Sequence, residues 1–89
     1  MISEQIRIIN RLGLHARAAA SFVKLASSYD SDISLVYDEQ SVNGKSIMGI
    51  MMLAASQGTN LLLEVNGTDE TAAARALLEL INSRFGEDE

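Results

Sequence analysis

Apolar residues recur along the chain at two different spacings, and these spacings predict four strands and three helices. Alternation of apolar and polar residues, the pattern of a strand with one buried face, marks residues 6–9, 33–37, 40–42 and 61–65. Apolar residues three or four positions apart, the pattern of an amphipathic helix, mark residues 16–26, 46–58 and a last segment from Thr68 or Asp69 to Arg84. The elements therefore follow the order β-α-β-β-α-β-α.

Turn-forming and capping residues separate these segments and favour one antiparallel sheet. The pair Asp38-Glu39 joins two strands as a hairpin, and Gly58 suits the left-handed position just past the end of a helix. A sheet that contains a hairpin, with too few helices to cover both faces, packs most economically with all its helices on one face. We therefore predict an α+β fold with a four-stranded antiparallel sheet and three helices on one side. The acidic end of the chain, residues 87–89, is expected to fray into solvent.

Length and composition limit what the chain can be. Its 89 residues, 47% of them hydrophobic, predict a single domain, residues 1–89, with one core. The absence of cysteine rules out disulfides and thiolate metal ligands. The first seven residues lack the apolar segment of a secretory signal, and the longest apolar stretch is too short to cross a bilayer, so we expect a cytoplasmic protein without membrane insertion. A net charge of −5 disfavours nucleic acid as the main ligand.

The single histidine, His15, stands at the predicted start of the first helix, where unpaired backbone N–H groups attract anions. Arg17 follows two positions later and adds a guanidinium that can grip phosphate oxygens. An imidazole in this place could act as a general base, a metal ligand or a nucleophile toward phosphorus, or it could simply cap the helix. A metal site is disfavoured because no second histidine or cysteine exists. A general base needs a pocket that so short a chain rarely encloses, so capture of a phosphoryl group needs the least additional structure.

Two segments of the sequence resemble the signatures of a known family. Residues 10–17, Asn-Arg-Leu-Gly-Leu-His-Ala-Arg, are similar to the active-site signature of HPr, the histidine-containing phosphocarrier of the bacterial phosphoenolpyruvate-dependent phosphotransferase system. Residues 42–53 resemble the second signature of the family, which surrounds its regulatory serine. The resemblance extends over essentially the whole chain, and it implies the HPr-like open-faced β-sandwich, which agrees with the predicted α+β class.

The resemblance also implies roles for particular residues. His15 would accept the phosphoryl group through Nδ1, and Arg17 would stabilise the phosphoryl oxygens together with backbone N–H groups of residues 16 and 17. The implied partners are enzyme I as donor and enzyme IIA proteins as acceptors, with no cofactor, and the chain would be a carrier rather than an enzyme. Ala18 stands where sugar-branch members usually carry proline. Residues 17–20, Arg-Ala-Ala-Ala, at the start of the first predicted helix, and the ending Ile-Asn-Ser-Arg-Phe at residues 81–85 resemble the nitrogen-branch relative, NPr, which we therefore favour.

The helix predicted after Asn43-Gly44 carries two further candidates. Ser46 is suited to cap this helix, and it also occupies the position of the family's regulatory serine, which an HPr kinase/phosphorylase would modify. Apolar side chains surround most of the helix, which indicates either tight packing into the sheet or an exposed patch for partner docking. The residues that we assign to docking are Ile47, Met48, Met51 and Met52.

Two other classes of function fit the residues less well. A regulatory protein-interaction module, controlled by phosphorylation of Ser46, would not need both His15 and Arg17. A nucleic-acid-binding domain would need a basic stripe and stacking aromatic side chains, whereas the chain is acidic and has two tyrosines and two phenylalanines. We therefore predict a monomeric phosphocarrier that relays a phosphoryl group from enzyme I to an enzyme IIA protein.

Overall fold

Four strands and three α-helices make up the computed structural model, which describes residues 1–89. In chain order the elements are β1 (Ile2–Arg7), α1 (Ala16–Ala26), β2 (Asp32–Tyr37), β3 (Gln40–Asn43), α2 (Ile47–Met52), β4 (Asn60–Asn66), α3 (Glu70–Asn82) and the short 3-10 helix η1 (Arg84–Gly86). The strands form one antiparallel sheet in the order β1-β4-β2-β3, with β2 and β3 joined as a hairpin. The predicted α+β class and element order are confirmed.

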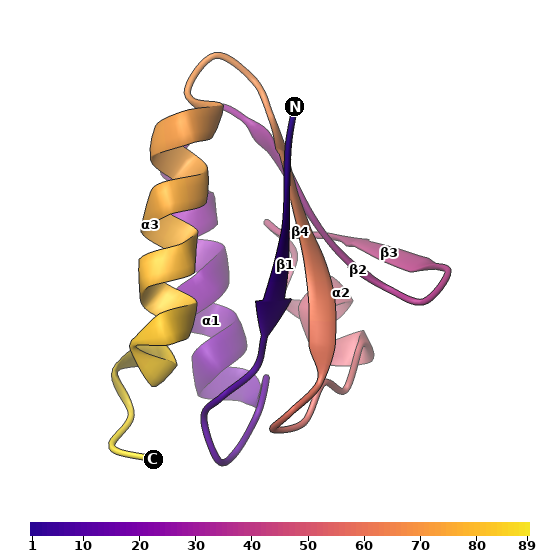
Figure 1. Cartoon of the computed structure of the whole chain (residues 1–89), viewed down its shortest axis with the longest axis vertical. Helices are drawn as coiled ribbons and strands as arrows, with labels where there is room; N and C mark the ends of the chain where they lie inside the picture. Colours follow the sequence, from indigo (N-terminus) through magenta and orange to yellow (C-terminus); the bar gives the residue numbers. More distant parts are fainter.

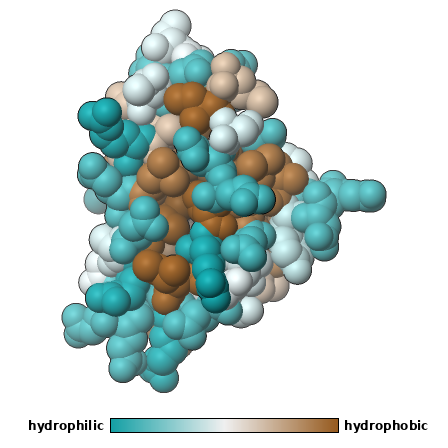
Figure 2. Space-filling view, in the orientation of Figure 1, coloured by the Kyte–Doolittle hydropathy of each residue, from teal (hydrophilic) through white to brown (hydrophobic).

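The core lies between the sheet and the helices. Helices α1 and α3 lie side by side along one face of the sheet, and α2 packs against α1 and β3 (Figure 1). Each layer contributes side chains that are completely buried, among them Phe22 of α1, Ile50 of α2, Leu63 of β4 and Leu77 of α3. On the side of the molecule seen in Figure 2, apolar patches lie in the middle and polar side chains surround them. None of the helices is long and apolar enough to cross a membrane.

The first strand starts earlier than the sequence pattern predicts. Alternation marks residues 6–9, whereas β1 covers Ile2–Arg7 and pairs along its length with β4, with Ile6 opposite Leu61. Because β1 is an edge strand and its residues 3–5 are polar and exposed, the apolar signal of a strand is missing from its middle. Ile8 lies beyond the strand but is buried, and its N–H donates to the Thr59 carbonyl at 3.0 Å.

Helix α2 ends well before the predicted end at Gly58. Its last residue is Met52, and Ala54 adopts a left-handed conformation with φ of 51°, which interrupts the helix. The next residue, Ala55, accepts a hydrogen bond from the backbone N–H of Leu14 at 2.8 Å. The chain after α2 therefore supports the loop before α1, and this contact between distant segments replaces the last part of the predicted helix.

Helix α3 also ends sooner than predicted, at Asn82 instead of Arg84. Arg84 and Phe85 both have left-handed φ values, 59° and 55°, so the chain leaves the helix and continues as η1. Phe85 is buried among the core residues. This turn redirects the last residues of the chain toward the start of α1, with consequences for the functional site.

Of the two residues predicted to start the last helix, Thr68 and Asp69, Asp69 occupies the N-cap position of α3, but it does not cap the helix through its side chain. Its carboxylate instead accepts hydrogen bonds from the backbone N–H groups of Asp30, at 2.8 Å, and Ser31, at 3.0 Å. The Ser31 hydroxyl, followed by the Asp30 N–H, holds the pKa of the Asp69 carboxyl below its usual range. Asp69 therefore joins the start of α3 to the turn before β2.

Candidate functional site

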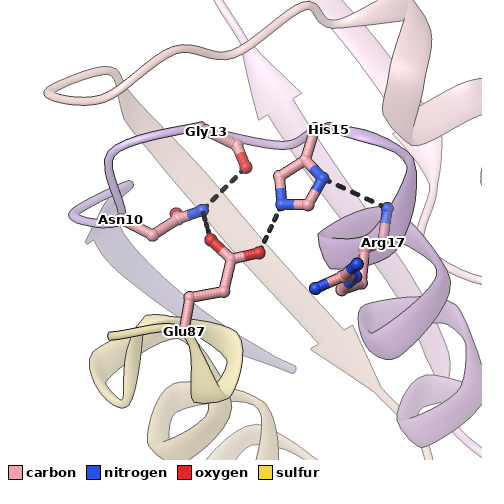
Figure 3. A network of polar contacts seen from close by, with 5 residues as sticks. All are labelled: Asn10, Gly13, His15, Arg17 and Glu87. Carbon is pink, nitrogen blue, oxygen red and sulfur yellow. Dashed lines mark hydrogen bonds and ion pairs between the residues drawn. The ribbon is translucent and has the colours of Figure 1, made fainter. Parts of the chain in front are cut away.

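The loop between β1 and α1 is held by hydrogen bonds, and it sets the position of His15. The side-chain amide of Asn10, which is fully buried, donates to the Gly13 carbonyl at 2.8 Å, and the Gly13 N–H donates back to the Asn10 carbonyl at 3.1 Å. The next residue, Leu14, is buried and bonded to Ala55. His15 leaves this fixed loop as the N-cap residue of α1 (Figure 3).

The imidazole of His15 meets a polar group at each of its ring nitrogens. The backbone N–H of Arg17 donates to Nδ1 at 3.3 Å, and Nε2 contacts the carboxylate oxygen Oε2 of Glu87 (Figure 3). A ring nitrogen that accepts a hydrogen bond carries a lone pair instead of a proton, so Nδ1 is the nucleophilic nitrogen of this arrangement. The side chain of His15 is 27% exposed, which leaves it accessible to a partner.

Glu87 is the residue of this site that the sequence analysis missed. The expectation that residues 87–89 fray is wrong, because the Glu87 side chain is only 15% exposed and its Oε1 accepts a hydrogen bond from Asn10 Nδ2 at 3.0 Å. Arg11 holds the end of the chain, with its N–H on the Glu89 carbonyl at 2.8 Å and its Nε on the Glu89 carboxylate at 2.9 Å. The only signal in the sequence was the complementary charge of Arg11 and the acidic end.

The Glu87 carboxylate is ionised at neutral pH. The hydrogen bond from Asn10, followed by the one with His15, holds the pKa of the Glu87 carboxyl below its usual range. This folded-state pKa lies below that of the unfolded chain. The docked end of the chain therefore stabilises the fold at pH values above 4.5, the ordinary pKa of a glutamate. That stability is lost as the pH falls through the lowered value, when Glu87 takes up a proton.

The guanidinium of Arg17 is available to bind an anion beside His15. It forms no salt bridge in the structure, unlike that of Arg11. Arg17 is exposed and lines an open depression together with Arg11, Leu12 and residues 85–89. No group of three or more His, Cys, Asp or Glu side chains is arranged to hold a metal. The start of α1 thus brings together a nucleophilic nitrogen and a free cation, which suits capture of a phosphoryl group.

Helix α2 presents Ser46 and four exposed apolar side chains. Ser46 is the N-cap residue, and its Oγ accepts a hydrogen bond from the Gly49 N–H at 3.1 Å. Of the helix's apolar residues only Ile50 is completely buried. The four residues assigned to docking have exposed fractions of 43% for Ile47, 76% for Met48, 43% for Met51 and 68% for Met52. None of the four is buried, although Ile47 and Met51 are more than half covered.

Comparisons with known proteins find close relatives in sequence and in structure. Residues 2–83 match the family model of the PTS HPr component phosphorylation site. The chain is 53% identical to phosphocarrier protein HPr of Neisseria meningitidis serogroup A over the whole of both chains, and 55% identical to that of Pseudomonas aeruginosa over 96% of each. Its structure is similar to that of HPr-C-His from Thermoanaerobacter tengcongensis, with a TM-score of 0.96, 49% identity and full coverage of both chains. The family match ends before Glu87.

Proposed function

The chain belongs to the HPr family of phosphocarrier proteins of the phosphotransferase system, and we propose that His15 is the residue that carries its phosphoryl group. HPr-family proteins interact with enzyme I and enzyme II components and are carriers instead of catalytic enzymes. The observation that carries the proposal is the hydrogen bond from the Arg17 N–H to Nδ1 of His15, because it requires a lone pair on this nitrogen. At 3.3 Å this bond is weak, so it yields readily to an incoming phosphorus.

The proposed transfer is an in-line displacement at phosphorus. Nδ1 of His15 donates its lone pair to the phosphorus of phosphorylated enzyme I, and the bond between phosphorus and enzyme I breaks with its electron pair left on enzyme I. Nε2 keeps its proton, so no proton has to move during the step. Arg17 and the N–H groups at the start of α1 stabilise the phosphoryl oxygens. A second displacement passes the group to a histidine of an enzyme IIA protein.

Replacing Arg17 by lysine is expected to slow phosphoryl transfer from enzyme I about 10-fold. Lysine keeps the charge but loses the planar fork that bonds two oxygens, and one charge-assisted hydrogen bond is worth about 1.5 kcal/mol, or one power of ten in rate. The rate is measured by rapid quench with phosphorylated enzyme I. Arg75→Lys, on the exposed face of α3, is the matched control and should transfer at the wild-type rate. Equal rates for both variants would contradict a role for the Arg17 fork.

We propose the exposed apolar side chains of α2 as the docking surface for the phosphoryl donor and acceptors. Helix α2 packs against α1, the helix that His15 caps. The residues that follow α2 are bonded to the His15 loop through Leu14 and Ala55. Methionine side chains adapt to surfaces of different shape, as a carrier with several partners requires. The apolar surface and the reactive nitrogen therefore lie close enough to be covered by one partner.

Changing Met48 and Met52 together to serine is expected to raise the KM for enzyme I about 10-fold and to leave kcat nearly unchanged. Both side chains are more than two-thirds exposed, so the free energy of unfolding should change by less than about 1 kcal/mol for the pair. Loss of two apolar contacts in an interface costs roughly 1–2 kcal/mol of binding. The control is Tyr37→Ser, which removes an exposed apolar side chain from the β2–β3 hairpin instead of from α2. An unchanged KM in the double variant would remove α2 from the docking surface.

Ser46 is proposed as a regulatory phosphorylation site. A phosphate there would add about −1.5 to −2 charges at the start of α2, beside Ile47 and the exposed methionines, and would weaken apolar docking. The enzyme required is an HPr kinase/phosphorylase. The hydroxyl already accepts the Gly49 N–H, so its modification also alters the cap of the helix.

The nitrogen-regulatory branch, represented by NPr, is proposed as the pathway of this carrier in preference to sugar uptake. Ala18 stands where sugar-branch members usually carry proline, and it is completely buried. Alanine in place of proline should therefore affect phosphoryl transfer through the rigidity of the first turn of α1, and not through direct contact with a partner. Rates of transfer from the phosphorylated chain to a nitrogen-regulatory and to a sugar-specific enzyme IIA decide between the branches.

A further inference from the structure

Glu87 contacts the reactive histidine from the side opposite to the nucleophilic nitrogen. Its Oε2 meets Nε2 of His15, while Arg17 approaches Nδ1 from the start of α1 (Figure 3). Its other oxygen, Oε1, accepts a hydrogen bond from Asn10 Nδ2, and this same amide donates to the Gly13 carbonyl in the loop before His15. The buried side-chain amide of Asn10 therefore holds both the loop before His15 and the Glu87 carboxylate that contacts the imidazole.

We propose that Glu87 is a positioning residue for His15: its carboxylate accepts the Nε2–H and holds the ring in the tautomer whose Nδ1 is free to take the phosphoryl group. This inference rests on the proposed function of His15. It gives the end of the chain, which lies outside the span of the family match, a part in phosphoryl transfer.

The two contacts of the ring select the same tautomer. A neutral imidazole places its proton on either nitrogen, and the other nitrogen then presents a lone pair. With the proton on Nδ1, the lone pair of Nε2 would face the Glu87 carboxylate and the Nδ1 proton would face the Arg17 N–H, so both contacts would be repulsive. The Arg17 contact is long, at 3.3 Å, which leaves the carboxylate as the stronger of the two determinants.

The carboxylate also acts on the phosphorylated state. When Nδ1 bonds to phosphorus and the bond to enzyme I breaks, Nε2 keeps its proton and the ring becomes a cation. The ionised Glu87 then faces this cation, so transfer creates an ion pair without moving a proton. The other charged groups around the pair are Arg17 on α1, and Arg11, Asp88 and Glu89 along the open depression. Arg11 and Glu89 neutralise each other in a salt bridge.

The test uses Glu87→Ala, with Asp88→Asn as the matched control that removes a neighbouring negative charge without touching the ring. In ¹⁵N NMR spectra of the unphosphorylated chain at alkaline pH, the wild type and the control should show only the Nε2–H tautomer of His15. Glu87→Ala should show both tautomers in exchange. Its kcat for transfer from enzyme I should fall roughly 10-fold, by analogy with the lower end of what the hydrogen-bond partners of metal-ligating histidines contribute, while KM stays the same. Glu87→Asp should recover part of the kcat.

The tautomer is measured without any phosphoryl donor, so this test is separate from the test of the proposed function. If wild-type His15 is phosphorylated but Glu87→Ala keeps the single Nε2–H tautomer and the wild-type kcat, the positioning role is wrong and the carrier function stands. If the tautomer shifts as expected but no phosphate is taken up by the wild type, the carrier function fails and the contact only fixes the ring. An effect of Asp88→Asn equal to that of Glu87→Ala would replace the specific contact with a general effect of charge.

Discussion

Replacement of His15 by alanine is expected to abolish the uptake of phosphate from phosphoenolpyruvate and enzyme I. The variant loses the only imidazole of the chain. With it goes Nδ1, the nitrogen that accepts a hydrogen bond from the Arg17 N–H and would attack phosphorus. The wild type, labelled with radioactive phosphoenolpyruvate, should carry phosphate that acid releases and base does not, as expected for phosphohistidine. His15→Ala should carry none.

Two controls make this result specific. Ser46→Ala removes the other proposed phosphate acceptor and should keep the full acid-labile label, at a cost of about 1 kcal/mol in stability from the lost helix cap. Circular dichroism should show that His15→Ala is folded, because the imidazole is partly exposed and lies outside the core. A label that persists in His15→Ala would place the phosphoryl group on another residue.

Replacement of Gly13 by alanine is expected to cost about 2–6 kcal/mol of the free energy of unfolding, and to impair phosphoryl transfer in the molecules that remain folded. Gly13 has a φ of 70°, where a side chain strains the backbone, and an added Cβ would lie 2.5 Å from the Ala55 carbonyl oxygen and 2.9 Å from Ser56 Cα. Left-handed strain and overpacking each cost about 1–3 kcal/mol. Their sum is a large part of the roughly 5–15 kcal/mol that stabilises a native domain.

The effect of Gly13→Ala on transfer follows from what the clash would move. Ala55 holds the Leu14 N–H, so pushing these segments apart displaces the loop that presents His15. Urea unfolding and the transfer rate measure the two effects. Gly58→Ala is the matched control, because Gly58 has a φ of 91° but only the Arg7 guanidinium lies near its added Cβ, at 3.8 Å. Gly58→Ala should lose only about 1–3 kcal/mol of the free energy of unfolding, the cost of the backbone strain. Equal losses in both variants would mean that the contact with Ala55 does not constrain the loop.

The fold was predictable where each element carries its own signal. The hairpin of β2 and β3, the strand β4 and the helix α1 were found within about one residue of their observed ends. The errors occur where contacts between distant segments override a local pattern. Helix α2 stops early because Ala55 pairs with the loop before α1. The polar edge strand β1 carries little alternation of its own and is defined mainly by its pairing with β4.

The residues of the candidate site were likewise predictable only where their signal is local in the sequence. His15 and Arg17 were found because they are adjacent in sequence at a helix start, and because the segment around them resembles a known signature. Glu87 lies 72 residues from His15, and it reaches the site only because the left-handed turn at Phe85 reverses the chain. A run of acidic residues at the end of a chain is usually solvated, so sequence composition pointed away from this contact.

Nδ1 of His15 is the nitrogen that we propose to carry the phosphoryl group. This assignment can be checked by ¹⁵N and ³¹P NMR of the ¹⁵N-labelled chain after phosphorylation by enzyme I. We expect one phosphorus resonance, coupled to Nδ1 of His15, with Nε2 still bearing its proton against Glu87. A phosphorus coupled to Nε2, or bonded to any residue other than His15, would contradict it.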